Sequence, residues 1–405
     1  MIPRPNTNLA GAGWNGGLTQ DIVVVGDDNH LYDILFWDGG SNPGSYPWFL
    51  YDITVTGEQQ SQAKMPPPVS SAATPRGGSA LAVFTSPGYS MGSYNVQSIG
   101  NVLAYIGGSD DNPVVEAVYL DLGNPLNLTQ ASSTQNYPPA AWSSLAAWGW
   151  LGQGSQHVVY ADYNNHVSEL YSVRSNYAWS YNNLSVHTGY TGTSAPRVKS
   201  PLAGYAFENQ ETQHVFYIAQ DNTIRELVYS GKWSGNNLSL ETKAPYPMAD
   251  GPLVAYVNEY DSTQHVIYIA GNGDIQELWW SSRTGWVAGQ PDLTQTTGAP
   301  MPAANSALAG YSCEWERSEH VIYVGSDGDL YELYNIRGSW ATTNLSGFPW
   351  IVATPPIDGT PLTGYSWVND HTQHVFYIDI NKNVHELYRQ GDTWATGVLS
   401  GGLTV

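Results

Sequence analysis

One short motif returns along most of this chain and constrains its fold more than any other feature. The motif reads Gln213-His214-Val215-Phe216-Tyr217, and Ile224-Arg225-Glu226-Leu227 follows it. Five copies occur, and in each the histidine and the glutamate lie twelve residues apart. The five pairs are His157 with Glu169, His214 with Glu226, His265 with Glu277, His320 with Glu332, and His374 with Glu386. Self-similarity with a period of about fifty residues indicates a repeat architecture.

Each repeat contains four short segments with the composition of β-strands. The first is apolar and ends in an aromatic ring, as in Leu202-Ala203-Gly204-Tyr205. The histidine and glutamate segments follow, and the fourth begins near a tryptophan and usually closes with Asn/Asp-Leu-Ser/Thr. The segments are rich in Val, Ile, Tyr and Trp and are separated by turn-forming residues. No helical period is sustained, so the chain is predicted to be all-β.

Two weaker copies precede the five clear ones. They run from Leu9 to Thr54 and, with insertions, from Leu81 to Thr129. Seven sets of four antiparallel strands predict a seven-bladed β-propeller, whose radial closure protects most sheet edges. We expect a single domain over residues 1–405, with crossovers between blades in proline-rich runs such as Pro66-Pro67-Pro68. The approximate blades are 1–70, 71–139, 140–197, 198–248, 249–304, 305–357 and 358–405.

Two familiar motifs are better explained by the repeat. Asn-Leu-Ser/Thr matches a glycosylation sequon at Asn127, Asn183, Asn237 and Asn344. Aspartate occupies the same position in other repeats, which favours a structural device at the end of the fourth strand. The run Ser326-Asp327-Gly328-Asp329 lacks the flanking pattern of a calcium loop and is predicted to be a β-turn.

The charge balance excludes several classes of partner. Lys and Arg number 14 against 35 Asp and Glu, which gives a formal net charge of −21. Such a chain repels phosphate, so neither nucleic acid nor an anionic membrane is an expected partner. Only 12% of the residues are charged, whereas Tyr (28) and Trp (16) are abundant. Recognition is therefore expected to use amides, hydroxyls and rings.

Cysteine and histidine usage argues against a metal or a disulfide framework. Cys313 is the only cysteine, and the repeated histidines fall one to a blade, where they cannot surround one ion. We therefore predict neither a metal nor a cofactor.

The sequence contains no apolar run long enough to enter a membrane. The start, Met1-Ile2-Pro3, lacks an apolar signal core. We expect a protein that is cytoplasmic or is released without a recognisable signal peptide.

With its motifs aligned in this way, the chain resembles the PLL-like (Photorhabdus-type) seven-bladed propeller lectins. The Gln-His-Val-x-Tyr, x-x-Glu-Leu and Asp/Asn-Leu-Ser/Thr signatures cover essentially all of it and are strongest from about residue 140 onwards. The resemblance implies a multivalent sugar-binding protein without catalysis. It also implies a preference for fucosylated and related, sometimes O-methylated, glycans, and frequent homo-oligomerisation.

The chain is more distantly similar to the six-bladed fungal fucose lectins of the Aleuria type. Those lectins use an arginine and a glutamate at the separation of His214 and Glu226, together with a tryptophan of the adjoining blade. Because histidine replaces the arginine here, the mode of sugar contact does not transfer directly. By this resemblance the sets are His157, Glu169 and Trp233; His214, Glu226 and Trp286; His265, Glu277 and Trp340; His320, Glu332 and Trp394; and, if the ring closes, His374, Glu386 and Trp48.

The chemistry of these three residue types suits a neutral sugar. A carboxylate and an imidazole serve its hydroxyls, and an indole covers its apolar face. Burying the methyl group of fucose contributes up to about 1 kcal/mol. Clefts between blades are concave and partly apolar, as small-ligand sites usually are. The rings that close the first segments are further candidates for stacking: Trp148, Tyr205, Tyr256, Tyr311 and Tyr365.

Three alternatives remain open from the sequence. The repeated His, Glu and Trp residues could serve only the packing of the repeat. The protein could be an interaction scaffold that uses the irregular residues 85–100 or 41–46. A propeller glycosidase is the least favoured interpretation, because such an enzyme needs one singular pair of carboxylates and this chain offers equivalent copies.

Overall fold

A computed structural model describes residues 8–399, with gaps at 15–18, 38–47, 55–73, 77–78, 88–89, 92–93, 96–97, 110, 121–123, 135–136, 174–177, 290, 350, 352–353 and 369. The predicted segment 41–46 therefore lies outside the described residues. Within 85–100, two short strands pair with each other, β6 (Ser90–Met91) and β7 (Tyr94–Asn95).

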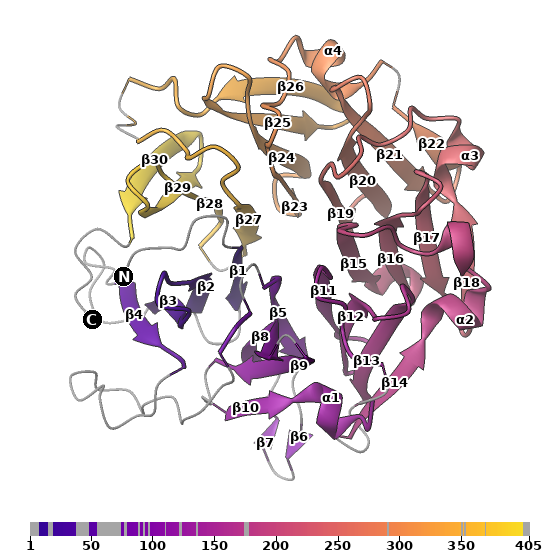
Figure 1. Cartoon of the computed structure of the whole chain (residues 1–405). Coiled ribbons are helices and arrows are strands. Elements are labelled where there is room, and N and C mark those ends of the chain that lie inside the picture. Colours follow the sequence, from indigo (N-terminus) through magenta and orange to yellow (C-terminus); the bar gives the residue numbers. More distant parts are fainter. Residues whose placement is uncertain are drawn as a thin grey trace. The chain divides into compact units, whose positions relative to one another are not determined.

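The chain is a seven-bladed β-propeller with four antiparallel strands in each blade, as predicted (Figure 1). Blade 1 contains β1 (Leu9–Trp14), β2 (Thr19–Val25), β3 (Leu31–Trp37) and β4 (Trp48–Asp52). Blade 2 contains β5 (Leu81–Pro87), β8 (Ser98–Ser109), β9 (Asn112–Tyr119) and β10 (Asn124–Asn127). Blade 3 contains β11 (Leu145–Trp150), β12 (Ser155–Ala161), β13 (Val167–Val173) and β14 (Trp179–Asn183).

The remaining four blades follow the same order. Blade 4 contains β15 (Leu202–Phe207), β16 (Thr212–Ile218), β17 (Ile224–Tyr229) and β18 (Trp233–Asn237). Blade 5 contains β19 (Leu253–Asn258), β20 (Thr263–Ile269), β21 (Ile275–Ser281) and β22 (Gly285–Ala288). Blade 6 contains β23 (Leu308–Cys313), β24 (Ser318–Val324), β25 (Leu330–Ile336) and β26 (Ser339–Asn344). Blade 7 contains β27 (Leu362–Trp367), β28 (Thr372–Ile378), β29 (Val384–Gln390) and β30 (Thr393–Val398).

The contacts group the blades into two compact units. The first unit holds blades 1–3, and the second comprises residues 165–167 and 184–398 and so holds blades 4–7. The assignment of the whole chain to a single domain stays a prediction. None of the described helices has the length and apolar character that a membrane span requires.

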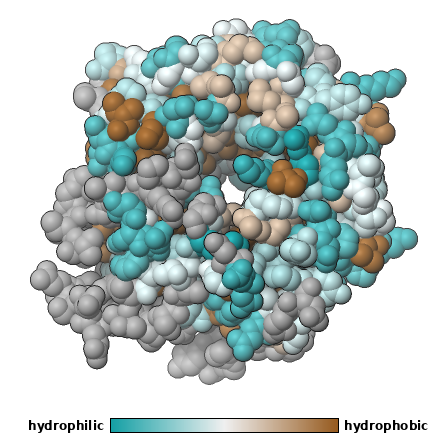
Figure 2. Space-filling model, viewed as in Figure 1, coloured by the Kyte–Doolittle hydropathy of each residue, from teal (hydrophilic) through white to brown (hydrophobic). Residues whose placement is uncertain are grey.

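The hydrophobic core lies between successive blades. In the second unit, Phe216 of blade 4 and Val266 of blade 5 belong to one buried cluster, and Ile267 and Val321 link blades 5 and 6 in another. The second and third strands supply these residues because both of their faces are covered, so their apolar runs are nearly continuous. On the face shown in Figure 2, the hydrophobic residues of the described surface form small separate patches.

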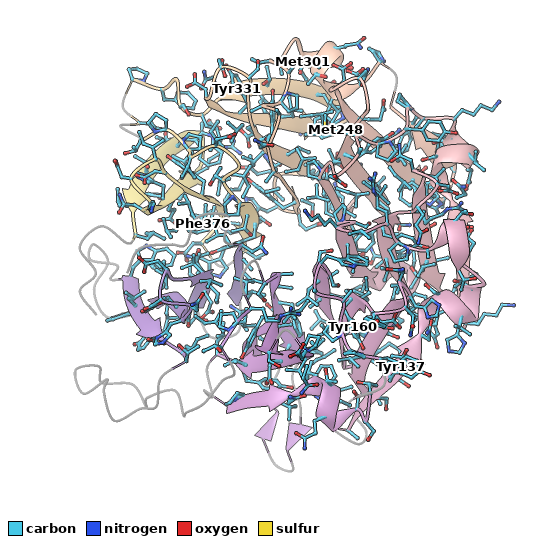
Figure 3. The ribbon with its side chains drawn as sticks, viewed as in Figure 1. Tyr137, Tyr160, Met248, Met301, Tyr331 and Phe376 are labelled. Atoms are coloured by element: carbon cyan, nitrogen blue, oxygen red, sulfur yellow. The ribbon has the colours of Figure 1, made fainter. Side chains whose placement is uncertain are left out.

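The tyrosine of the repeated motif ties each blade to the crossover that precedes it. The hydroxyl of Tyr160 donates to the backbone carbonyl of Tyr137 at 2.9 Å, and both residues are labelled in Figure 3. Tyr217, Tyr268, Tyr323 and Tyr377 make the same bond, each to a carbonyl twenty-three residues earlier. Close to each accepting carbonyl in the sequence, a proline forms an isolated β-bridge with the residue that follows the second strand. Pro247 and Ala270 form such a bridge.

The Asx-Leu-Ser/Thr sequence is the structural device that the repeat predicted. In blade 4, Asn237 caps a short helix, α3 (Leu238–Thr242), by accepting a bond from the Leu240 backbone N–H at 3.1 Å. Leu238 is fully buried, and the Ser239 hydroxyl accepts from the Ile224 backbone N–H that opens the third strand, at 2.9 Å. Short helices follow the fourth strands of other blades too: α1 (Leu128–Ala131), α2 (Leu184–Thr188) and α4 (Leu293–Thr297). These helices are too short to produce a helical period in the sequence.

Removing a motif hydroxyl should destabilise the fold. Tyr268→Phe leaves the Pro245 carbonyl without its bond at 2.6 Å, and we expect the free energy of unfolding to fall by about 1–2 kcal/mol. Urea unfolding measures the change. The control is Tyr246→Phe, because Tyr246 is 54% exposed in the same crossover. Equal losses in the two variants would contradict the anchoring role.

Candidate functional site

The five His–Glu pairs are buried hydrogen bonds inside the blades. His214 lies on the second strand. Glu226 lies on the third strand and pairs with Phe216, which is two positions after His214. Side chains alternate between the faces of a strand, so His214 and Glu226 share a face as diagonal neighbours. His214 Nδ1 lies 2.7 Å from Glu226 Oε1. The other four pairs have the same contact at 2.7–2.8 Å: His157–Glu169, His265–Glu277, His320–Glu332 and His374–Glu386.

The second nitrogen of each histidine is also engaged. His214 Nε2 lies 2.8 Å from the hydroxyl of Thr212, the residue two positions earlier on the same face. Ser155, Thr263, Ser318 and Thr372 occupy this place in the other copies. None of the five histidine residues is more than 5% exposed. The histidines therefore hold the second and third strands together, and a role in ligand contact stays a prediction.

The aromatic residues of the first strands cover these histidines. Tyr256 stacks on His265 with ring centroids 5.1 Å apart, and its equivalents lie 5.0–5.4 Å from their own histidines. All five rings are buried: Trp148, Tyr205, Tyr256, Tyr311 and Tyr365. They offer little surface to a ligand, and their role in stacking on a sugar stays a prediction.

The glutamates reach toward the next blade at two junctions, as the resemblance implied. Trp286 Nε1 of blade 5 donates to Glu226 Oε2 at 3.1 Å, and Trp340 Nε1 of blade 6 donates to Glu277 Oε2 at 3.2 Å. The structure thus brings together two complete sets of histidine, glutamate and tryptophan. Trp286 is buried, whereas Trp340 is partly exposed.

The other predicted sets are not assembled by a described contact. Trp394 is buried in the core cluster of blades 6 and 7, and its approach to Glu332 stays a prediction. The sets that contain Trp233 and Trp48 would join the two compact units and also stay predictions. In blade 2, where Glu116 lacks a histidine partner, burial raises the pKa of its carboxyl to about 7 although Asn127 opposes the shift.

A cleft of about 590 Å³ lies between blades 5 and 6. His265, Glu277 and Trp279 line it from blade 5, and Trp340 lines it from blade 6. Helix α4 contributes a further side, through Leu293 and Thr296. The two indoles are partly exposed while the imidazole and the carboxylate are buried. The cleft therefore combines ring surface with hydrogen-bonding groups at its floor, and its volume suits a small ligand.

Glu319 also lines this cleft, although its place in the repeated motif did not predict it as a site residue. The other four copies carry glutamine at this position: Gln156, Gln213, Gln264 and Gln373. Glu319 Oε1 lies 3.1 Å from His265 Nε2 across the blade junction. Asn258 donates to the same oxygen at 3.2 Å, and Asn335 donates to Glu319 Oε2 at 2.9 Å. The change from Gln to Glu within an otherwise regular motif was the signal that could have identified this residue.

The imidazole of His265 lies between two carboxylates, which favour its charged form. Burial by itself disfavours the charged ring, but Glu319 and Glu277 outweigh it and raise the pKa of His265 to about 10. Burial likewise opposes ionisation of Glu319, but the charge of His265 and three hydrogen bonds hold the pKa of its carboxyl below the ordinary value of 4.5.

Among the described residues, two groups of side chains lie close enough to be considered for a metal ion. In the first, the His265 ring separates Glu277 from Glu319, and each ring nitrogen already contacts a carboxylate. An ion would have to displace these contacts.

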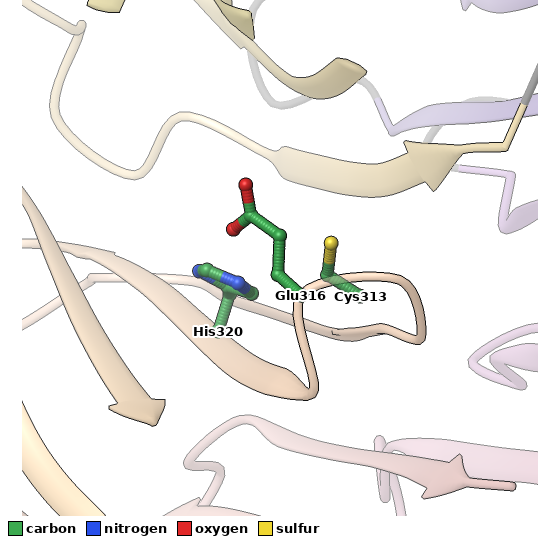
Figure 4. A group of neighbouring side chains, drawn as sticks. All are labelled: Cys313, Glu316 and His320. Atoms are coloured by element: carbon green, nitrogen blue, oxygen red, sulfur yellow. The ribbon is translucent and has the colours of Figure 1, made fainter. Parts of the chain in front are cut away.

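Figure 4 shows the second group, Cys313, Glu316 and His320. Arg389 donates to Glu316 at 2.7 Å, and burial raises the pKa of the Cys313 thiol to about 12. In both groups the carboxylates already have partners, so these residues fit an ion poorly.

The fold is similar to that of several solved lectins. BP39L lectin from Burkholderia pseudomallei has a TM-score of 0.60 and 16% identity over 96% of this chain and 97% of its own. A variant of Aleuria aurantia lectin in complex with alpha-methyl-L-fucoside has a TM-score of 0.55 and 15% identity over 99% of this chain and 97% of its own. AofleA from Arthrobotrys oligospora has a TM-score of 0.53 and 11% identity over 98% and 87%. The predicted likeness to the Aleuria type is confirmed for the fold. No protein-family model matches the chain, and neither does any curated protein.

The ion pair across the junction should make stability depend on pH. The raised pKa of His265 gives a contribution that is complete below 6.5 and lost as the pH rises through about 10. The lowered pKa of Glu319 gives a contribution that is present above 4.5 and lost in acid. We expect Glu319→Gln to lower the free energy of unfolding by about 1.5–3 kcal/mol near pH 6 and by less toward pH 10.

Urea unfolding of both proteins across this pH range measures the difference. Glu211→Gln is the control, because Glu211 is an exposed carboxylate outside the cleft. A loss of stability that stays constant from about pH 6 to 10 would show that the ion pair contributes nothing.

Proposed function

We propose that the protein is a multivalent lectin that binds saccharides without catalysis in clefts between adjacent blades. The cleft between blades 5 and 6 carries this proposal, because it joins partly exposed indoles to buried carboxylates. Rings cover the C–H face of a sugar, and carboxylates accept bonds from its hydroxyls. The preference we propose is for fucosylated or related, including O-methylated, glycans. Its support is the likeness in fold to lectins that were solved with fucosides.

The state of the carboxylates favours binding over glycoside hydrolysis. A glycosidase needs a carboxylic acid that is still protonated at working pH. Glu319 has a pKa below its ordinary value, and Glu277 accepts bonds from both His265 and Trp340. Glu319 is therefore not prepared to donate a proton to a leaving group, and Glu277 is engaged as an acceptor.

A glycan array with labelled protein, followed by titration of the best ligand, tests the proposal. We expect Trp279→Ala to weaken binding about tenfold through this cleft, which corresponds to about 1.4 kcal/mol. Tyr246→Ala is the matched control, because it removes an exposed ring that does not line the cleft. A blank array would favour an interaction scaffold. Binding that tolerates Trp279→Ala would move the sugar site to another junction.

The repeated glutamates give a second test of the same site. Glu277→Gln keeps the shape of the side chain but removes the charge that faces His265 and Trp340. We expect the affinity of this cleft for its best glycan to fall by about tenfold or more, since hydrogen bonds to charged groups are the stronger ones. Isothermal titration calorimetry should show this as a loss of one class of sites. An unchanged isotherm would contradict a role for the carboxylate.

A further inference from the structure

The unused hydrogen-bonding capacity at the floor of the cleft between blades 5 and 6 consists of acceptors. Both nitrogens of His265 face carboxylates, and Trp340 Nε1 donates to Glu277. Asn335 uses its amide nitrogen on Glu319, while its Oδ1 is buried with no hydrogen-bond partner. A carboxylate oxygen can accept about two bonds, and Glu319 Oε2 and the two oxygens of Glu277 each have one described partner. A ligand that supplies donors, and above all a positive charge, is therefore the complement of this floor.

The cluster differs from its counterparts at three positions that lie together. Glu319 replaces glutamine, and the two asparagines that support it are equally particular to this junction. Asn258 corresponds to Phe207, Cys313 and Trp367 in blades 4, 6 and 7. Asn335 corresponds to Tyr229, Trp280 and Arg389 in blades 4, 5 and 7. All three residues differ from the repeated pattern and lie in one cluster. They therefore indicate a built arrangement and not an isolated substitution.

The neighbouring junctions show what the glutamine does when it is present. Tyr205 donates its hydroxyl to Gln264 Oε1 at 2.9 Å, and Tyr311 does the same to Gln373 at 3.2 Å. At the junction of blades 5 and 6, the carboxylate of Glu319 turns to His265 instead, and the buried Tyr256 hydroxyl has no hydrogen-bond partner. The repeat gives up one packing bond here in exchange for a second carboxylate in the lining of the cleft.

We propose that Glu319 makes the cleft between blades 5 and 6 selective for saccharides that carry an ammonium group. This inference rests on the proposed lectin function and names a ligand class for one of its sites. An amino sugar supplies N–H donors and a positive charge to a cleft lined by the carboxylates of Glu277 and Glu319. The indole faces of Trp279 and Trp340 also attract a cation. No lysine or arginine is among the residues that line the described cleft, so sugars with carboxylate or sulfate groups are repelled.

Titration with a matched series of sugars tests the inference. Methyl glucosaminide, methyl N-acetylglucosaminide and methyl glucuronide share one ring and carry a positive, a neutral and a negative group. At about pH 6 we expect the full-length protein to bind the amino sugar about tenfold more tightly than the N-acetyl sugar, and the uronide more weakly still. In Glu319→Gln the ratio of the first two affinities should fall toward one, while Glu211→Gln should keep it.

Methyl α-L-fucoside is titrated in parallel, because it distinguishes a failure of the charge selectivity from a failure of the lectin function. If the fucoside binds but the amino and N-acetyl sugars bind equally to the wild-type protein, the charge selectivity is wrong and the lectin function stands. The charge selectivity of Glu319 is equally wrong if the preference for the amino sugar survives in Glu319→Gln. If no sugar of the series and no fucoside binds, the lectin function fails, and this inference fails with it. The comparison of the three sugars on the wild-type protein needs no variant, so it tests the inference even if Glu319→Gln does not fold.

Discussion

The buried hydrogen bond between a histidine and a glutamate is the contact on which blades 3–7 are built. Neither group can be buried alone without a large cost, because a polar group removed from water needs a partner. The pair satisfies both, and a serine or threonine hydroxyl satisfies the remaining nitrogen of the ring. Its geometry requires the second and third strands to stay in one register, since a shift of one residue would send the two side chains to opposite faces. The constant spacing of twelve residues in the sequence follows from that requirement.

This repeated scaffold also allows one junction between blades to differ from its neighbours. Where the glutamine of the motif is retained, as at Gln264 and Gln373, it accepts a bond from a buried tyrosine and closes the junction. Where Glu319 replaces it, the junction gains an ion pair and lies beside a cleft. A repeat protein can specialise one site in this way, because the neighbouring copies maintain the fold while one copy departs from it.

The sequence predicted the architecture well, since each level of its pattern pointed to the same structure. Strand composition, turn residues and the period of the motif all indicated four-stranded blades, and seven are present. The contact of His214 with Glu226 was expected, and so was the approach of Trp286 and Trp340 to the preceding glutamates. The short helix after the fourth strand was not expected, because four or five residues complete little more than one turn and leave no period to detect.

The residue types alone could not show which of the repeated side chains a ligand can reach. His265 and Tyr256 carry suitable chemistry for a sugar, yet both are buried against each other inside blade 5. Trp279, which pattern reasoning did not select, lines the cleft together with Glu277, because residues two positions apart share one face of a strand. Accessibility depends on how two blades pack, and packing distance is not encoded in any single repeat.

By itself the sequence determined the all-β class, the number of blades and the pairing of histidine with glutamate. These features are local or periodic, and they follow from strand alternation and from a fixed spacing that a short turn imposes. Only the tertiary structure decided that the imidazoles are enclosed, that a cleft lies between blades 5 and 6, and that Glu319 meets His265 across that junction. Those two residues are more than fifty positions apart and belong to different sheets, so their contact arises only when the blades pack together. The charge of this junction is therefore a property of the folded protein and not of either repeat.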